Sequence, residues 1–223
     1  MNFRRFRNWW LLPLLLGAGA LLAQVAPATP AGQGRWRLVV ADWSWVRADL
    51  AWEGRDEARS RAWSRLAVAA APTVDYFRLN AARMHAYDFP AWREAREPGA
   101  PAALRARWRR ESAAEAIALL TVEGAPTAAC LIEAGNIALY ARRDPASAAE
   151  FYRRAAETPG APWHAGRIYA ELLRQTGRPR EALAWLRGWW PRLPADDPAA
   201  QRELVAARIA ELERELGERP EAL

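Results

Sequence analysis

Residues 163–194 read WHAGRIYAELLRQTGRPREALAWLRGWWPRLP and carry the pattern that decides the fold. Apolar residues recur at helical spacing on both sides of Gly177, and Pro194 ends the second segment. Small and large apolar residues alternate at fixed positions: Ala170, Ala182, Leu186 and Trp189. Small residues let two helices approach, and large ones pack against neighbouring helices. The stretch therefore predicts two antiparallel helices joined near Gly177.

The spacing of a small residue and two packing residues recurs along the chain. The three sets are Ala113, Ile117 and Leu120; Ala148, Tyr152 and Ala155; and Ala182, Leu186 and Trp189, at offsets of 35 and 34 residues. The segments NAARMHAY (80–87) and EAGNIALY (133–140) also align without a gap, and an APT turn lies shortly before each. A period of this length is typical of stacked helix pairs.

These residues resemble the tetratricopeptide-repeat family, in which each repeat is a pair of antiparallel helices. The best match is residues 163–196, through Ala170, Leu173, Gly177, Ala182, Leu186, Trp189 and Pro194. Residues 128–162 match through Gly135, Ala148, Tyr152 and Ala155, with one extra residue that we assign to the inter-helix turn. The resemblance implies an all-α fold, an α-solenoid of such pairs with a C-terminal capping helix.

The chain divides into five expected regions. They are a signal anchor or signal peptide (1–25), a linker (26–35), degenerate helical repeats (36–127), two repeats resembling the family (128–196), and a capping helix with a tail (197–223). Expected helix starts are Ser112 with Glu115, Ser147 with Glu150, and Asp197 before Pro198. Between the two helices of the degenerate second hairpin, residues 88–101 replace the expected short turn.

The N-terminus has the composition of an export or anchor segment. Three arginines precede a run without charge from Asn8 to Gly34, which directs the rest of the chain outward. The 18 residues from Trp9 to Ala26 approach the ~20 that span a bilayer, whereas Ala26-Pro27-Ala28 has the form of a cleavage site. We expect a single-pass inner-membrane protein with its body in the bacterial periplasm; the alternative is secretion to the periplasm after cleavage.

The net charge of +6 does not predict nucleic-acid binding. Every basic residue is Arg, and Arg alternates with Glu along the expected helices, as on a solvated surface. The single cysteine, Cys130, has no partner for a disulfide within the chain. His85 and His164, the only histidines, belong to no recognisable metal-ligand motif. The sequence therefore predicts no enzyme, no cofactor and no metal site.

The resemblance implies a partner-binding face on the first helices of the repeats. It assigns that face to Asn136, Tyr140, His164, Arg167, Glu171 and Arg174, with another protein or a peptide as the partner. No Lys/Asn set recurs along successive first helices, so recognition of a free C-terminus is not implied. The expected function is a noncatalytic scaffold of the cell envelope.

The 13 tryptophans leave a carbohydrate- or peptidoglycan-binding module as the alternative, with a helical-solenoid enzyme as a third possibility. The two leading interpretations differ in tryptophan exposure. In ADWSWVRADLAW (41–52), Trp45 and Trp52 share a helical stripe with Ala41 and Ala48, which predicts that both are core residues. Trp43 falls off that stripe and stays available for a membrane surface or a ligand.

Overall fold

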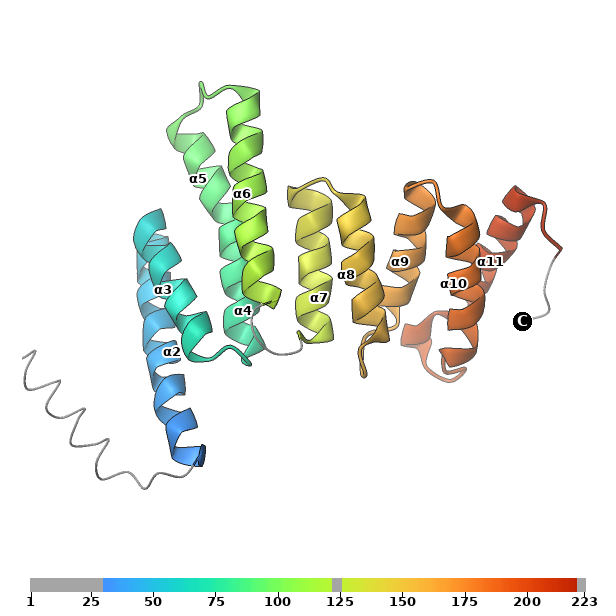
Figure 1. Cartoon of the computed structure of the whole chain (residues 1–223), viewed down its shortest axis with the longest axis horizontal. Coiled ribbons are helices and arrows are strands. Elements are labelled where there is room, and N and C mark those ends of the chain that lie inside the picture. Colours follow the sequence, from blue (N-terminus) through green and yellow to red (C-terminus); the bar gives the residue numbers. More distant parts are fainter. Residues whose placement is uncertain (1–29, 122–125, 220–223) are drawn as a thin grey trace, which may run out of the picture.

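The computed structural model describes residues 30–121 and 126–219, and in these ranges the protein consists of helices and turns without strands (Figure 1). The predicted all-α class is confirmed for this part of the chain. The expected signal or anchor segment, 1–25, lies outside the described residues. Within the described ranges, no helix combines the length and the hydropathy needed to cross a bilayer.

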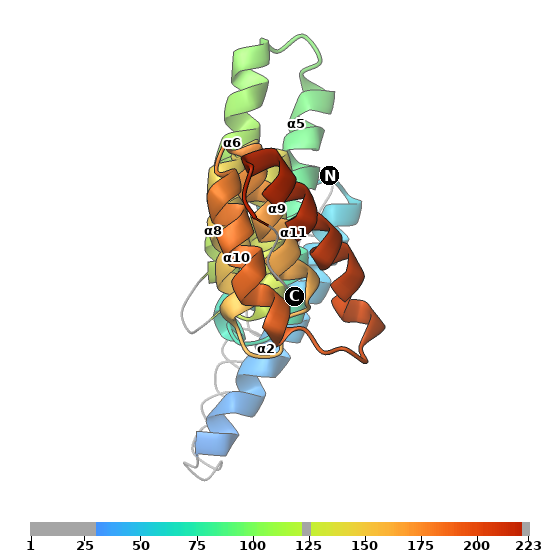
Figure 2. The same ribbon diagram turned by 90° about the vertical axis from the view of Figure 1, so that its right-hand side faces the viewer.

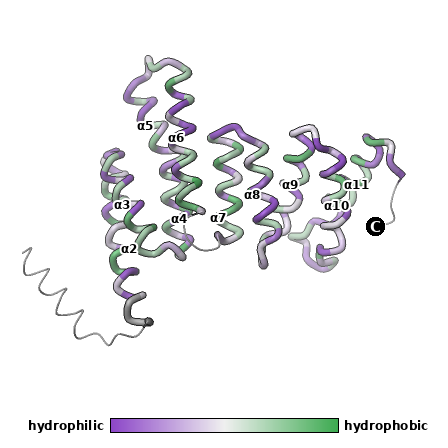
Figure 3. The backbone as a smooth tube through the Cα atoms, viewed as in Figure 1, coloured by the Kyte–Doolittle hydropathy of each residue, from purple (hydrophilic) through white to green (hydrophobic). Residues whose placement is uncertain are grey.

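Most helices pair into antiparallel hairpins that stand side by side in one row (Figure 1). The elements are α2 (Pro30–Glu53), α3 (Glu57–Ala70), α4 (Asp75–Arg83), η1 (Met84–Asp88), α5 (Phe89–Arg96), α6 (Ala102–Thr121), α7 (Ala128–Asn136), η2 (Ile137–Ala141), α8 (Pro145–Glu157), α9 (His164–Gln175), α10 (Pro179–Trp189), η3 (Trp190–Arg192), η4 (Pro198–Ala200) and α11 (Arg202–Leu216). Hydrophobic and hydrophilic residues alternate along them (Figure 3), as expected of helices that bury one face.

The first hairpin, α2 with α3, begins earlier than the sequence indicated. Residues 30–35, expected to belong to the linker, are already helical because α2 starts at Pro30. Proline is well suited to a first helical position, since its missing N–H would have no intrahelical partner there. The stripe prediction holds for Trp45, which is buried, but not for Trp52, which is 40% exposed and donates its indole N–H to Asp88 at 2.8 Å.

Residues 88–101 lengthen the second hairpin. The segment α5 continues α4 through η1, and α6 runs back without interruption from Ala102 to Thr121, so the hairpin tip rises above its neighbours (Figure 1). The helix start expected at Ser112 is therefore wrong, because Ser112 lies buried in the middle of α6. Glu115, expected to complete its capping box, pairs with Arg61 and Arg65 instead.

The start of α8 also differs from the expectation. Asp144, three residues before Ser147, is the N-cap, and its carboxylate accepts from the Ser147 backbone N–H at 3.0 Å. Pro145 then occupies the first turn, which explains why the helix begins there. Asp197 does cap the segment that begins at Pro198, but this segment is the short η4, and α11 follows only at Arg202.

Two first helices contain a π-helical segment at the same place. η1 and η2 begin 53 residues apart, which is the offset between the aligned segments at 80–87 and 133–140. In η2 the backbone N–H of Arg142 donates to Ile137 O at 3.1 Å, an i to i−5 bond. Each π-helical turn accommodates one additional residue within a helix. The extra residue of 128–162, assigned to the inter-helix turn from the sequence, therefore lies within η2.

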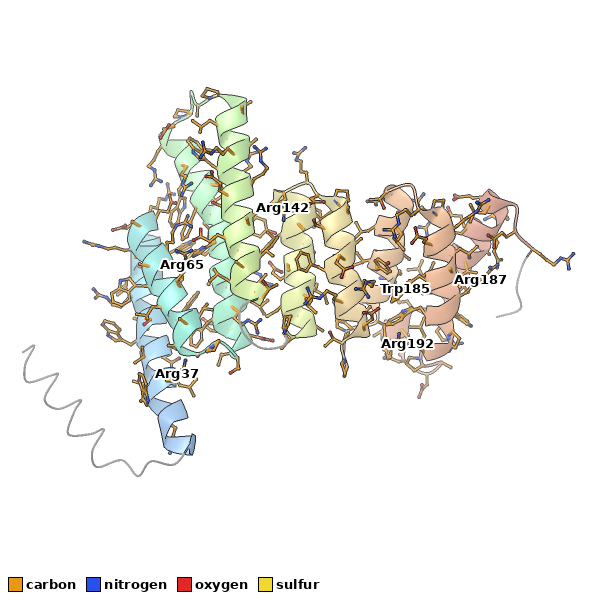
Figure 4. The ribbon with its side chains drawn as sticks, in the orientation of Figure 1. Arg37, Arg65, Arg142, Trp185, Arg187 and Arg192 are labelled. Carbon is orange, nitrogen blue, oxygen red and sulfur yellow. The ribbon has the colours of Figure 1, made fainter. Side chains whose placement is uncertain are left out.

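The last helix packs on α10 and completes the row. Its stripe of Val205, Ile209 and Leu212 is buried, as expected of a capping helix with one face in solvent. Arg187 of α10 holds the end of α11 in place, donating to Glu213 at 2.9 Å and to Glu218 at 3.0 Å (Figure 4). These contacts tie α10 to the C-terminal end of α11.

Candidate functional site

In the C-terminal half of the row, successive helices lie on opposite sides. Seen along the row, α9 and α11 lie on one side, here called the first-helix side, and α8 and α10 lie on the other (Figure 2). The first-helix side carries the residues that the sequence assigned to partner binding. Two hollows on the described surface contain some of these residues, and each hollow lies between elements of neighbouring hairpins.

The first hollow, here called the α9–α11 groove, has a volume of about 280 Å³. Its walls are Arg167, Ile168, Ala170, Glu171 and Arg174 from α9, and Leu204, Arg208 and Leu212 from α11. Arg167, Glu171 and Arg174 are spaced i, i+4 and i+7, which places them on one face of α9. Leu204, Arg208 and Leu212 follow the same face of α11 at i, i+4 and i+8.

A branched ion pair connects the walls of the α9–α11 groove. Glu171 lies 2.7 Å from Arg174 Nη2 and 3.7 Å from Arg208 Nη2, so one carboxylate faces guanidinium groups from both helices. The Arg174 hydrogen bond lowers the pKa of Glu171 against the opposing effect of burial. Arg208 also pairs with Glu211 at 2.6 Å, and Arg167 donates to Gln201. With Glu211 counted, the groove and its rim contain three arginines and two carboxylates, which leaves a net charge of +1.

Apolar side chains complete the α9–α11 groove. Leu204 is 51% exposed at its edge, Ile168 is half-buried and Leu212 is buried beneath it. Binding sites in proteins commonly combine an apolar floor with a few charged groups that fix the orientation of the ligand. A hollow of about 280 Å³ can take side chains from another protein, and its charge favours an acidic one.

The second hollow, here called the tyrosine pocket, lies between the two π-helical segments and has a volume of about 310 Å³. Its lining consists of Ala86, Tyr87, Pro90, Ala91, Glu94, Arg109, Tyr140, Ala141 and Arg143. Tyr87 and Tyr140 occupy equivalent positions in η1 and η2. Glu94 and Arg109 pair at 2.6 Å across α5 and α6. The pocket is thus built from elements whose π-helical turns the sequence did not predict.

The structure separates the six residues that the sequence assigned to the partner-binding face. Arg167, Glu171 and Arg174 lie together in the α9–α11 groove, and Tyr140 lines the tyrosine pocket. Asn136 is used for packing, since its amide oxygen accepts from the Tyr152 hydroxyl at 2.6 Å. His164 begins α9 and lines neither hollow; burial and then Arg167 lower its pKa.

The sequence reasoning missed Leu204 and Arg208 of α11, as well as Tyr87. Leu204 lies beside the buried stripe of α11 and is exposed. A leucine next to a core stripe, but not on it, was the feature of the sequence that could have indicated a binding residue. Tyr87 could have been predicted from the sequence, because the alignment of NAARMHAY with EAGNIALY places it at the same position as Tyr140. The side chains of Arg208 and Arg174 meet through the carboxylate of Glu171, a contact that only the packing of α11 against the array defines.

A buried cluster between α3, η1 and α6 has the residue types of a hydrolytic triad. The Ser64 hydroxyl lies 3.0 Å from His85 Nε2, and His85 Nδ1 lies 3.5 Å from Glu115 Oε2. Burial and the nearby Arg61 and Arg65 lower the pKa of His85 to about 3, so the imidazole is neutral. Ser64 and His85 are fully buried, which keeps a substrate from the hydroxyl. We interpret the cluster as a polar network that ties the first two hairpins together.

Cys130 lies in a similarly closed environment. Its thiol is buried 3.4 Å from Asp75 Oδ1, and burial raises its pKa, which disfavours the reactive thiolate. The described residues contain no group of three or more His, Cys, Asp or Glu side chains arranged to hold a metal ion.

Comparison with known proteins gives no further assignment: no family model matches the chain, and no curated protein matches it significantly.

Proposed function

We propose that the chain is a noncatalytic scaffold of the tetratricopeptide-repeat type that binds a segment of another protein in the α9–α11 groove. The observation that carries this proposal is the convergence of Arg167, Glu171 and Arg174 with Leu204 and Arg208 on one hollow of the first-helix side. Binding by helices that are already folded requires no cofactor and little ordering of the receptor surface.

The lining of the groove indicates the chemistry of the partner segment. Leu204 and Ile168 offer apolar contact. Arg167 donates to the neutral Gln201, whereas Arg174 and Arg208 each pair with a carboxylate. A short helix or extended segment that combines one acidic and one aliphatic side chain fits both features. The acidic group would approach Arg167, because Arg174 and Arg208 already form ion pairs with Glu171.

The test compares two double charge reversals. Arg167→Glu with Arg174→Glu changes the groove, whereas Arg178→Glu with Arg180→Glu places the same charges at the start of α10. The two sets are matched, because Arg174 and Arg178 each pair with a glutamate three residues away. In affinity capture from solubilised membranes, the groove variant should lose a defined partner that the wild type and the α10 variant retain. Equal recovery by all three chains would reject the proposal.

The proposed location is the cell envelope, with the body of the chain in the periplasm and residues 1–25 as its anchor; secretion after cleavage is the alternative. This part of the proposal rests on the sequence alone. A C-terminal reporter enzyme that is active only outside the cytoplasm would test the orientation, and extraction by carbonate would separate an anchored chain from a cleaved one. Activity of a cytoplasm-dependent reporter would contradict the proposed orientation.

A carbohydrate- or peptidoglycan-binding module is the second candidate, because Trp36 and Trp43 expose more than half of their surfaces. Such modules need aromatic faces in solvent. Trp43, however, packs edge-on against Trp63 at 5.0 Å, and Arg47 lies 5.9 Å from both rings. If this function is right, soluble peptidoglycan fragments should protect the tryptophan fluorescence of the wild type from an added quencher, and they should not do so in Trp36→Ala. That result would favour this function over the scaffold.

A further inference from the structure

Helix α2 has apolar side chains on two opposite faces. One face, with Ala41, Trp45 and Ala48, is buried against the neighbouring hairpin helices. The other face carries large apolar side chains that are each at least 55% exposed: Trp36, Val39, Trp43, Val46 and Leu50. A helix that is apolar on both sides is normally covered on both sides. Apart from the edge contact of Trp43 with Trp63, the outer face of α2 therefore lacks a cover within the described part of the chain.

The outer face has the spacing of a coiled-coil seam. Its residues follow one another at intervals of 3, 4, 3 and 4, so Trp36, Trp43 and Leu50 take the a positions of a heptad, and Val39 and Val46 take the d positions. This 3.5-residue period keeps a seam facing another helix over its whole length. Leu38 is also exposed on α2 but does not belong to the seam, so it can serve as an exposed control residue outside the seam.

We propose that the outer face of α2 binds the same face of a second copy of this chain, in a parallel two-helix seam. The charges beside the seam favour this partner. In the heptad, Asp42 takes position g and Arg47 takes position e, and both are exposed. In a parallel pair, a g residue faces the e residue five positions on in the other helix, so Asp42 of each copy meets Arg47 of the other.

The same charges disfavour a lipid surface as the cover. Helices that lie on membranes carry mainly Lys and Arg beside their apolar face. Here Asp42 and Asp49 flank the seam together with Arg35 and Arg47, so half of the flanking charges would repel anionic headgroups. A second copy instead supplies an opposite charge for Asp42 and a matching apolar row for the seam.

The position of α2 leaves room for a second copy. The helix stands at one end of the row, and its N-terminal part extends beyond the other helices in both views (Figures 1 and 2). Arg37 fixes this part by donating to the carbonyls of Ala69 and Ala70 at 3.2 Å or less (Figure 4). A parallel arrangement also lets the chain preceding Pro30 leave both copies at the same end. The dimer would present two α9–α11 grooves, which raises the apparent affinity for a bivalent partner.

Disulfide trapping in the full chain tests the seam and its direction. In a Cys130→Ala background, mild oxidation should link Val39→Cys to itself and Val46→Cys to itself, because parallel d positions face their own copies. The matched control, Leu38→Cys, is exposed on the same helix and should stay unlinked. In an antiparallel pair each d position faces an a position of the other helix. Such a pair would link Val39→Cys to Trp43→Cys or to Leu50→Cys in a mixture and would not link Val39→Cys to itself, and that outcome would overturn the parallel seam.

A second set of variants tests the interface without introduced thiols. Val46→Glu should convert the dimer to a monomer in analytical ultracentrifugation while leaving helix content unchanged, because Val46 is exposed in the single chain. Asp42→Arg and Arg47→Asp should each weaken the dimer, and the double exchange should restore it. A dimer that persists in Val46→Glu overturns the proposal. The proposal is also overturned if the wild type is monomeric and floats with phosphatidylglycerol vesicles through its seam residues.

Discussion

Gly166 and Trp189 meet where α9 packs against α10, at a separation that leaves no room for a methyl group. A Cβ atom on Gly166 would lie 2.5 Å from Cε2 of the indole, and it would approach two further ring atoms within 2.8 Å. Trp189 is itself buried and cannot swing into solvent without losing its packing. The close approach of these two helices therefore depends on a glycine at position 166.

The first prediction concerns this contact. Gly166→Ala should lower the free energy of unfolding by roughly 1–2 kcal/mol, because overpacking outweighs the better helix propensity of alanine. Gly188→Ala is the matched control, since nothing lies within 4 Å of its Cβ position, and it should be neutral or stabilising by up to about 1 kcal/mol. Urea denaturation measures both. Equal stabilisation by the two substitutions would mean that the indole does not occupy this site.

The second prediction concerns Glu57, which connects α3 to the lengthened hairpin. It accepts from Arg61 at 2.9 Å, from Arg93 at 2.9 Å and from Arg96 at 2.8 Å. Burial raises the pKa of Glu57, but the hydrogen bonds from Arg93 and Arg61 outweigh it, and the pKa is lowered overall. Glu57→Gln should cost about 2 kcal/mol of unfolding free energy, between the values for exposed and for buried ion pairs, because the partly buried Arg61 and Arg93 lose the carboxylate that they share.

The control for Glu57 is Glu150→Gln on the exposed surface of α8, which should cost less than about 1 kcal/mol. Hydrogen exchange adds a local measure. Amides of α5 should lose more protection than those of α9 in Glu57→Gln. A uniform loss of protection across the chain would show that Glu57 does not act mainly on the lengthened hairpin.

The third prediction is a pH dependence that originates at His85. Because its pKa is lowered to about 3 in the folded protein, from 6.5, the unfolded chain binds the additional proton between these values. Stability is therefore lost as the pH falls from about 6.5 towards 3, with a slope of up to about 1.4 kcal/mol per pH unit from this group. His85→Gln should flatten the profile by that amount below pH 6.5 and leave its shape above pH 6.5 unchanged. An identical acid slope in the variant would contradict the burial of a neutral imidazole.

The fourth prediction concerns Tyr152. Its hydroxyl donates to Asn136, and burial, followed by Tyr140, raises its pKa to about 12. Tyr152→Phe should cost about 1 kcal/mol, the usual net worth of one hydrogen bond. Ultraviolet titration should show that the variant loses the absorbance change near pH 12. A change lost near pH 10 instead would place the hydroxyl in solvent.

Much of the helical architecture followed from residue spacing, because small and large apolar residues recur at the fixed intervals that a stack of helix pairs buries. Ala113, Ala148 and Ala182 are all fully buried, as their shared position in the pattern implies. Local signals were less reliable. Ser112 and Glu115 have the spacing of a capping box, yet both lie within the long helix α6. There Glu115 forms ion pairs with Arg61 and Arg65 of another helix instead of capping a helix start.

The candidate groove was predictable only on its α9 side. Arg167, Glu171 and Arg174 share a helical face, and this follows from the period of the helix alone. Which residues lie opposite depends on the rotation of α11 about its own axis, and that rotation is set by the packing of Val205 and Ile209 together with the contact of Arg187 with Glu213. Trp52 shows the same limit, since its position on a stripe gave no hint of Asp88 as a partner.

The paired π-helical segments change how length differences between the hairpins should be interpreted. A residue added inside a helix turns all that follows by roughly 100°, unless a wider turn takes it up. η1 and η2 take it up where Tyr87 and Tyr140 lie, and both of these tyrosines are exposed. An alignment of these hairpins should therefore place its gap within the first helix. Removing one residue there, rather than from the loop, is the change that would convert one repeat length into the other.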